Sequence, residues 1–239
     1  MQIPIIAEER HFLLVDKPAG LACHRDADGT PALLDRVREQ TGIGGLHLVH
    51  RLDKLTSGLL LLARDAAGAA LLGEQFAGRA IGKFYLALSD KAPAKKQGML
   101  RGDMEKGRNG SWRLSQQCHD PALTQFFSHG LGGGRRLFVV RPLTGRTHQI
   151  RVALKALGSP ILGDVRYGGA AADRGYLHAY ALDFCLDGVD FRYRCPPAYG
   201  EAWPSLSDWP ALTEPWGLPW PAAPGRRPAV NAESPGEPG

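Results

Sequence analysis

The sequence predicts an α+β fold built around a largely antiparallel sheet. Segments with strand-like alternation or β-branched and aromatic content are interspersed with segments of helical periodicity. Two short glycine-containing connections, GLGGGRR at 130–136 and LDGVDF at 186–191, are typical of hairpins. Because short connections join antiparallel neighbours, they favour such a sheet over repeated strand–helix–strand units.

Each predicted element has its own pattern. The apolar runs FLLVD (12–16) and SGLLLLAR (57–64) have the length of strands, and the second is typical of a fully buried strand. Helical periodicity occurs at 31–40, 66–76 and 147–157, and in the last of these Ile150, Leu154 and Leu157 would face the core. The other strands are expected at 46–52, 83–89, 123–128, 136–141 and 177–184.

The remaining segments bound the domain. Residues 97–115 are polar, basic and contain glycine, so we expect a surface hairpin, either a solvated insertion or a contact to substrate. From Pro196 onward the chain holds 11 of its 18 prolines and four of its five tryptophans. We expect one catalytic domain over 1–220, onto which these tryptophans pack back, and a Pro/Gly-rich disordered tail over 221–239.

Composition and charge indicate an ordinary globular protein of 239 residues, 44% apolar and 22% charged. The formal charge of +5 fits a polyanionic partner without requiring one. The four cysteines, Cys23, Cys118, Cys185 and Cys195, lack the spacing of metal ligands, so neither a metal site nor a disulfide is expected. No targeting signal or membrane-length apolar run is present, and we therefore expect a cytoplasmic protein without a membrane partner.

Two polar blocks border apolar runs. In VHRLDKLTSGLLLLARD (49–65), Asp53 precedes the buried strand, where a carboxylate is costly unless it is paired or needed for chemistry. In RPLTGRTHQIRVALKALGSPILGD (141–164), Arg151 lies at the edge of the apolar helix stripe and needs an anionic partner. The simplest interpretation is that the two blocks meet and that Arg151 and Asp53 form an ion pair.

These segments resemble the RluA-type family of RNA pseudouridine synthases. Four motifs match in order: LLVDKPAGL (13–21), HRLDKLTSGLLLLAR (50–64), KFYLAL (83–88) and PLTGRTHQIRVALKALGSPILGD (142–164). The resemblance implies isomerisation of uridine to pseudouridine in ribosomal or transfer RNA, with no metal and no cofactor. It also implies a mixed, mainly antiparallel central sheet with flanking helices and an RNA-binding cleft.

By the same resemblance, Asp53 matches the essential aspartate, Tyr85 the tyrosine that packs on the target base, and Arg151 the partner of the aspartate. Arg51 matches the residue that fills the gap left by the flipped nucleotide. The chemistry agrees, because the isomerisation needs one carboxylate and no redox equivalents. Without the family match, Asp53 would be interpreted as a turn residue and Tyr85 as a packing residue.

Other assignments stay open. Arg146 and His148 could bind RNA phosphates or only cap the helix, and His50 and Lys54 could be structural, solvated or functional. Leu55 and Ala153 stand where relatives commonly carry an acidic residue and a histidine, and we expect these changes to affect which RNA is recognised. Because the motifs begin close to residue 1, site selection should rest on the catalytic domain, which we expect to act as a monomer.

Two other classes of function are weighed against this one. An RNA-binding protein of the same fold without activity would gain nothing from a carboxylate beside phosphates, so Asp53 argues against it. A nucleoside or glycoside hydrolase usually needs two carboxylates that flank the bond, and the motifs supply one.

Overall fold

The computed structural model describes residues 1–25 and 29–221. A ten-stranded sheet contains β1 (Ile5–Glu8), β2 (Phe12–Lys17), β3 (His47–Leu48), β4 (Ser57–Ala63), β5 (Gly82–Ser89), β6 (Gln97–Gly102), β9 (Ala122–Gly132), β10 (Arg135–Pro142), β11 (Leu177–Leu186) and β12 (Val189–Arg194). The helices are α1 (Leu33–Thr41), α2 (Ala66–Ala77) and α3 (Gln149–Ala156), and β7 (Met104–Lys106) pairs with β8 (Trp112–Leu114) in a separate hairpin. The predicted α+β class is therefore confirmed. Apart from residue 221, the predicted tail lies outside the described residues.

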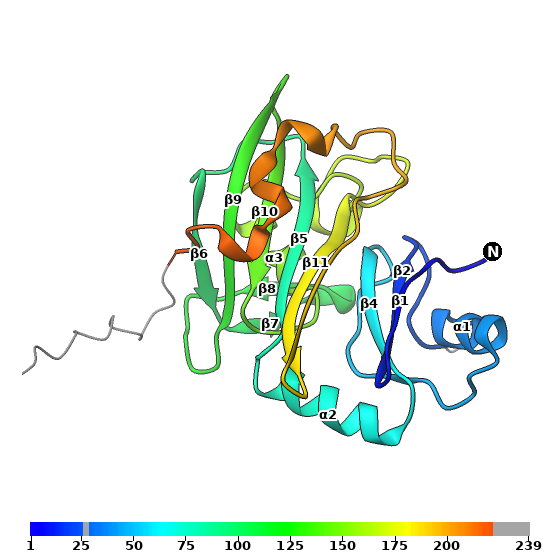
Figure 1. The fold of residues 1–239 in the computed structure, drawn as a ribbon. Coiled ribbons are helices and arrows are strands. Elements are labelled where there is room, and N and C mark those ends of the chain that lie inside the picture. The colour runs from blue at the N-terminus through cyan, green and yellow to red at the C-terminus, as the bar shows by residue number, and fades with distance from the viewer. Residues whose placement is uncertain (26–28, 222–239) are drawn as a thin grey trace, which may run out of the picture.

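The main path through the sheet runs β1-β2-β4-β11-β5-β10-β9-β6. The pairing of β4 with β11 is parallel, and the other described pairings are antiparallel, as predicted. The late strand β11 thus lies between β4 and β5, and Figure 1 shows it running through the middle of the molecule.

The junction of β4 and β11 requires glycine at position 58. Gly58 pairs with Ala179 and has a φ of +104°, a conformation that residues with a side chain rarely adopt. A Cβ atom at this position would lie 2.3 Å from the carbonyl oxygen of Ala179. The backbones of the two strands therefore approach as closely as they do because this residue has no side chain.

Strand β4 is buried over its whole length because helices cover both of its faces. On one face, Leu60 and Leu62 belong to the same apolar cluster as Leu33 and Val37 of α1. On the other face, Leu59 and Leu61 pack with Leu72 of α2. The apolar run that the sequence predicted as a fully buried strand is thereby confirmed.

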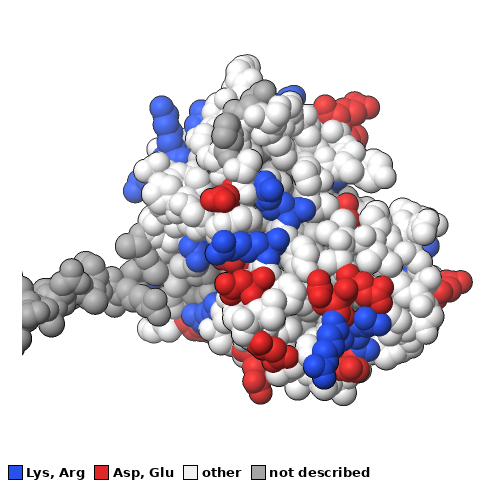
Figure 2. All heavy atoms as spheres, viewed as in Figure 1, with Lys and Arg blue, Asp and Glu red and all other residues white. Residues whose placement is uncertain are grey.

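The tryptophan-rich segment 203–220, which we call the strap, crosses the sheet in three short 3-10 turns, Leu206–Asp208, Pro210–Thr213 and Pro215–Gly217 (orange in Figure 1). The ring of Trp220 lies 5.8 Å from that of Phe84 on β5 and 5.0 Å from that of Phe127 on β9. The prediction that these tryptophans pack back onto the domain is confirmed. On this face, acidic and basic side chains are interspersed (Figure 2).

The predicted strand at 46–52 is wrong beyond Leu48, because residues 49–56 leave the sheet as a loop. Polar side chains of the segment 17–23 hold the backbone of this loop in place. The amine of Lys17, fully buried, donates to the carbonyls of Pro18, Leu21 and Lys54, and the Cys23 thiol contacts the backbone of Leu52.

The predicted surface hairpin at 97–115 is partly wrong. Its first part is β6, which pairs with β9 at the edge of the main sheet, and only β7 and β8 form the hairpin. Strands β1 and β12 were not predicted, although VDFRYR (189–194) alternates apolar and polar residues and follows the predicted hairpin connection at 186–191. None of the helices in the described ranges combines the length and apolar character needed to cross a membrane.

Candidate active site

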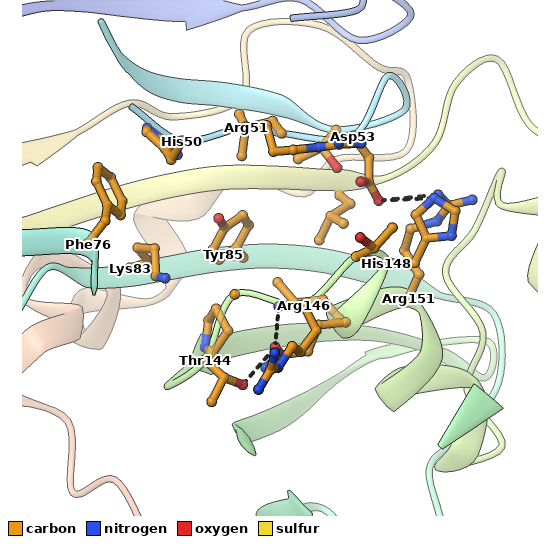
Figure 3. Close-up of a pocket in the computed structure, with 18 of the residues that line it drawn as sticks. His50, Arg51, Asp53, Phe76, Lys83, Tyr85, Thr144, Arg146, His148 and Arg151 are labelled. Atoms are coloured by element: carbon orange, nitrogen blue, oxygen red, sulfur yellow. Dashed lines mark hydrogen bonds and ion pairs between the residues drawn. The ribbon is translucent and has the colours of Figure 1, made fainter. Parts of the chain in front are cut away.

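A cleft of about 450 Å³ lies on the face of the sheet opposite the strap. Its walls come from the loop 49–56, the end of α2, the start of β5 and the segment 142–151. Alternation along β5 explains the separation of the two faces: Phe84 contacts the strap, whereas Lys83 and Tyr85 line the cleft. Figure 3 shows Tyr85 in the middle of the cleft, between two groups of polar residues.

The cleft is strongly basic. Among the described residues, Asp53 is the one acidic residue that lines it. The basic residues of the lining are Arg51, Arg79, Lys83, Arg146 and Arg151, together with His50 and His148. Such a surface suits a polyanion, and the single carboxylate stands out as the group with a different task.

Asp53 meets Arg151, as the sequence predicted. Arg151 Nη1 donates to Asp53 Oδ2 at 3.2 Å, across 98 positions of the sequence. Arg151 also makes a two-pronged ion pair with the buried Asp164, with Nε–Oδ2 at 2.7 Å and Nη2–Oδ1 at 2.8 Å. Burial disfavours the charged guanidinium, but the hydrogen bonds and charges of both carboxylates outweigh this and raise the pKa of Arg151. Arg151 is therefore a fixed cation.

The turn before α3 is built around the side chain of Gln149. Its Oε1 accepts from the Arg146 backbone N–H at 3.0 Å and from the Thr144 hydroxyl at 2.7 Å. Its Nε2 donates to the Leu123 carbonyl at 3.0 Å, which ties the turn to β9. These bonds satisfy backbone groups at the helix start and fix the direction in which Arg151 projects.

His148 lies beside the Asp53–Arg151 pair, in a left-handed backbone conformation at the start of α3. Its Nε2 is 4.0 Å from Asp53 Oδ2, and its Nδ1 is 2.7 Å from the hydroxyl of Tyr167. That hydroxyl also accepts from the backbone N–H of Trp112. Burial lowers the pKa of His148 although the Asp53 carboxylate opposes the shift, so we treat the ring as neutral near pH 7.

Tyr85 is 9% exposed. Burial, and after it the charge of Asp53, raises the pKa of its phenol, which is therefore protonated at neutral pH. Its ring forms part of the cleft wall and offers a flat apolar surface in the middle of a polar site.

The other predicted residues differ in their surroundings. Arg51 is exposed at the rim of the cleft. Arg146 is ion-paired with the exposed Asp120. His50 accepts a hydrogen bond from the Leu61 N–H and stacks on Phe76 at 4.5 Å, and burial lowers its pKa to about 3. Lys54 is exposed and does not belong to the lining of the cleft.

Sequence reasoning missed Asp164, Tyr167, Gln149 and Lys83. The first three complete the contacts of residues that were predicted, and Asp164 closes the second quoted polar block. The sequence feature that could have identified Asp164 is an acidic residue in an otherwise apolar turn, ILGD. Within the described ranges, no cluster of three or more His, Cys, Asp or Glu residues could hold a metal ion.

A model of the RNA pseudouridylate synthase family matches residues 11–156. An uncharacterized RNA pseudouridine synthase of Haemophilus influenzae is 43% identical over 205 residues, which cover 85% of this chain and 91% of that protein. Ribosomal large subunit pseudouridine synthase C of Escherichia coli is 33% identical over 202 residues, which cover 77% of this chain and 63% of the relative.

A solved structure has the same arrangement of elements. Human RNA Pseudouridylate Synthase Domain Containing 1 is 29% identical, with a TM-score of 0.69 over 82% of this chain and 84% of the human chain. Such agreement extends the likeness beyond the residues that the family model matches.

Proposed function

Because the chain belongs to the RluA-type family of RNA pseudouridine synthases, enzymes that isomerise uridine in RNA, we propose that Asp53 carries this reaction. The observation that supports the proposal is that, within the described part of the chain, Asp53 is the single acidic residue lining a cleft with five lysine and arginine residues. A hydrolase acting on the same bond would usually need a second carboxylate on the other side of it.

The proposed reaction rearranges bonds within one nucleotide. The glycosidic bond between C1′ and N1 breaks, the uracil turns, a bond forms between C1′ and C5, and the proton on C5 is lost while N1 gains one. Asp53 starts the sequence either by attack on C1′ or by removal of a sugar proton. Arg151 occupies Oδ2, and Oδ1 has no hydrogen-bond partner among the described residues, which leaves this oxygen free for the sugar.

Tyr85 and Arg51 act on the base rather than on the sugar in this proposal. The Tyr85 ring packs on the extruded uracil and limits where it can turn, and its protonated phenol can donate a hydrogen bond to the base. Arg51, exposed at the rim, replaces the uridine in the stack and offsets part of the cost of flipping, roughly a few kcal/mol. Arg146 and His148 line the route of the RNA strand.

We take ribosomal RNA of the large subunit as the substrate. The support is the names of the Escherichia coli relative and of a Pseudomonas aeruginosa relative, ribosomal large subunit pseudouridine synthase D, 34% identical over 71% of this chain. The matched regions cover 63% and 54% of those two proteins. A ribosomal substrate agrees with the expected cytoplasmic location. We keep the expected monomer as part of this proposal.

The test is a map of pseudouridines in ribosomal and transfer RNA from cells with the gene deleted and then restored. We expect one or more sites in large-subunit RNA to disappear on deletion, to return with the wild-type gene and to stay absent with the Asp53→Asn gene. A lost site in transfer RNA alone would contradict the substrate assignment, and recovery with Asp53→Asn would contradict the role of Asp53.

A further inference from the structure

The end of the cleft farthest from Asp53 contains two cations that the proposed reaction does not use. We call it the basic end, formed by Phe76, Arg79 and Lys83 from the end of α2 and the start of β5. Figure 3 shows Phe76 and Lys83 beside His50, with Tyr85 between them and the Asp53 group. The Lys83 amine lies over the Phe76 ring at 5.9 Å from its centroid.

Neither cation has an acidic partner among the described residues: no carboxylate lies within ion-pair distance of Arg79 or Lys83. Burial lowers the pKa of the Lys83 amine, and the charge of Arg79 lowers it further. Lys83 is half-buried and Arg79 is exposed, so the half-buried amine of Lys83 carries the cost of this like charge, and a bound anion would offset it. This arrangement differs from the other end of the cleft, where each charge has a partner.

A role in stabilising the end of α2 does not account for the two side chains. The last carbonyls of this helix accept from backbone groups: Gly78 N–H bonds to Glu74, Arg79 N–H to Phe76, and Ala80 N–H to Gln75. Arg79 itself has a φ of +57°, a conformation that favours Gly or Asn over Arg. The sequence thus places a long cation where a short residue would suit the backbone better.

We propose that the basic end binds a backbone phosphate of the RNA nucleotide next to the target uridine, held by Lys83 and Arg79. The inference rests on the proposed function, because it takes the target base to lie on Tyr85. Lys83 and Tyr85 are two residues apart on one face of β5, about 7 Å along the strand. An anion at Lys83 is therefore adjacent to a base on Tyr85, while Asp53 stays on the other side, away from the phosphate.

The experiment measures binding of a fluorescent nine-nucleotide oligouridylate between 50 and 300 mM salt, with every protein carrying Asp53→Asn so that no modification occurs. For single strands, each phosphate contact contributes about 0.7 to the slope of log affinity against log salt. We expect Lys83→Gln and Arg79→Asn each to reduce the slope by up to about this amount and to weaken binding roughly fivefold at low salt. Asparagine preserves the backbone conformation of Arg79.

The matched control is Lys95→Gln, an exposed lysine outside the cleft, which should leave affinity and slope unchanged. On the mapped RNA and with Asp53 intact, the loss in Lys83→Gln should appear in KM. Unchanged slopes in both cleft variants would overturn the phosphate site, as would a loss confined to kcat. The slope reports phosphate contacts and not the identity of the base, so an active Asp53→Asn protein would refute the role of Asp53 while the comparison of slopes would still test the phosphate site.

Discussion

The two ends of the cleft differ in whether their charged side chains have ion-pair partners. At one end, which we call the paired end, Asp53, Arg151 and Asp164 form a chain of ion pairs, and His148 is held by Tyr167. At the basic end, Lys83 and Arg79 face the cleft without a described acidic partner. Both ends lie on the same face of β5 and neighbouring loops, but the ion pair to Asp164 at the paired end is buried, whereas Lys83 is half-buried and Arg79 is exposed.

The contrast separates two demands on an RNA-modifying site. A group that takes part in bond breaking gains from partners that fix it before the substrate arrives, because no reorganisation is then needed during the reaction. A group that only holds the strand should have its counter-charge supplied by the RNA itself, since an internal carboxylate would compete with phosphate. The predictions below test this division.

The largest effect is expected for Asp53→Asn. The change removes the carboxylate charge at nearly constant size, so isomerisation should fall by at least about 10³-fold while RNA binding and melting temperature stay close to wild type. The measurement is single-turnover pseudouridine formation on the mapped RNA, with binding measured in parallel. A variant that retains more than a tenth of the wild-type rate would show that the Asp53 carboxylate is not required for the reaction.

Asp164→Ala should destabilise the folded protein, because it removes an ion pair of the paired end. Its side chain is 1% exposed and that of Arg151 8%, so the variant leaves a buried guanidinium with only the single bond to Asp53. We expect the free energy of unfolding to fall by about 3 kcal/mol, measured by urea denaturation. The control is Asp120→Ala, which breaks the exposed pair with Arg146 and should cost little. Equal effects in the two variants would show that the paired end is no more rigid than the surface.

The basic end should respond to pH through His50. Its pKa is about 3 in the folded protein and 6.5 when unperturbed, so the unfolded chain takes up the proton first as pH falls. The stability present above pH 6.5 is then lost toward pH 3, at about 1.4 kcal/mol per pH unit for this group. His50→Gln keeps an acceptor for the Leu61 N–H. Between pH 6 and 4, the free energy of unfolding of this variant should depend on pH less steeply than that of the wild type, by the equivalent of about one proton. Parallel slopes for the two proteins would mean that His50 is solvated.

The smallest effect is expected for Arg51→Ala, at the rim between the two ends. If Arg51 fills the vacancy left by the uridine, turnover should drop about tenfold more on structured RNA than on an unpaired oligonucleotide with the same uridine. The oligonucleotide has less stacking to lose. Equal losses on both substrates would assign Arg51 to general strand binding, together with the basic end.

How far the sequence predicted this site depends on whether the local sequence around a residue shows that it needs a partner. Asp53 and Arg151 could be paired in advance because each is a charge beside an apolar run. Asp164 could not, since an acidic residue after glycine also suits an exposed turn. Lys83 looks like a solvated residue at the start of a strand, and only the fold shows that Lys83 and Arg79 line the same cleft as Asp53.

The fold was predicted where periodicity is regular and missed where tertiary contacts override it. The helices were located to within a few residues, and β4 was recognised from its continuous apolar run. Residues 49–52 of the loop were interpreted as part of a strand because Leu52 continues the alternation that begins with Leu46 and Leu48. The loop leaves the sheet because the buried amine of Lys17 and the thiol of Cys23 bind its backbone, contacts that no local pattern encodes.

The position of β11 has a consequence for how the chain acquires its activity during synthesis. Strand β4 does not pair with β5 along the sheet; both pair with β11, which follows them by about a hundred residues. A growing chain that has not yet produced residue 186 therefore lacks the strand that joins its two halves. Because such distant pairings form late and slowly, the partial product should be inert toward RNA, and completion of β11 acts as the moment of maturation.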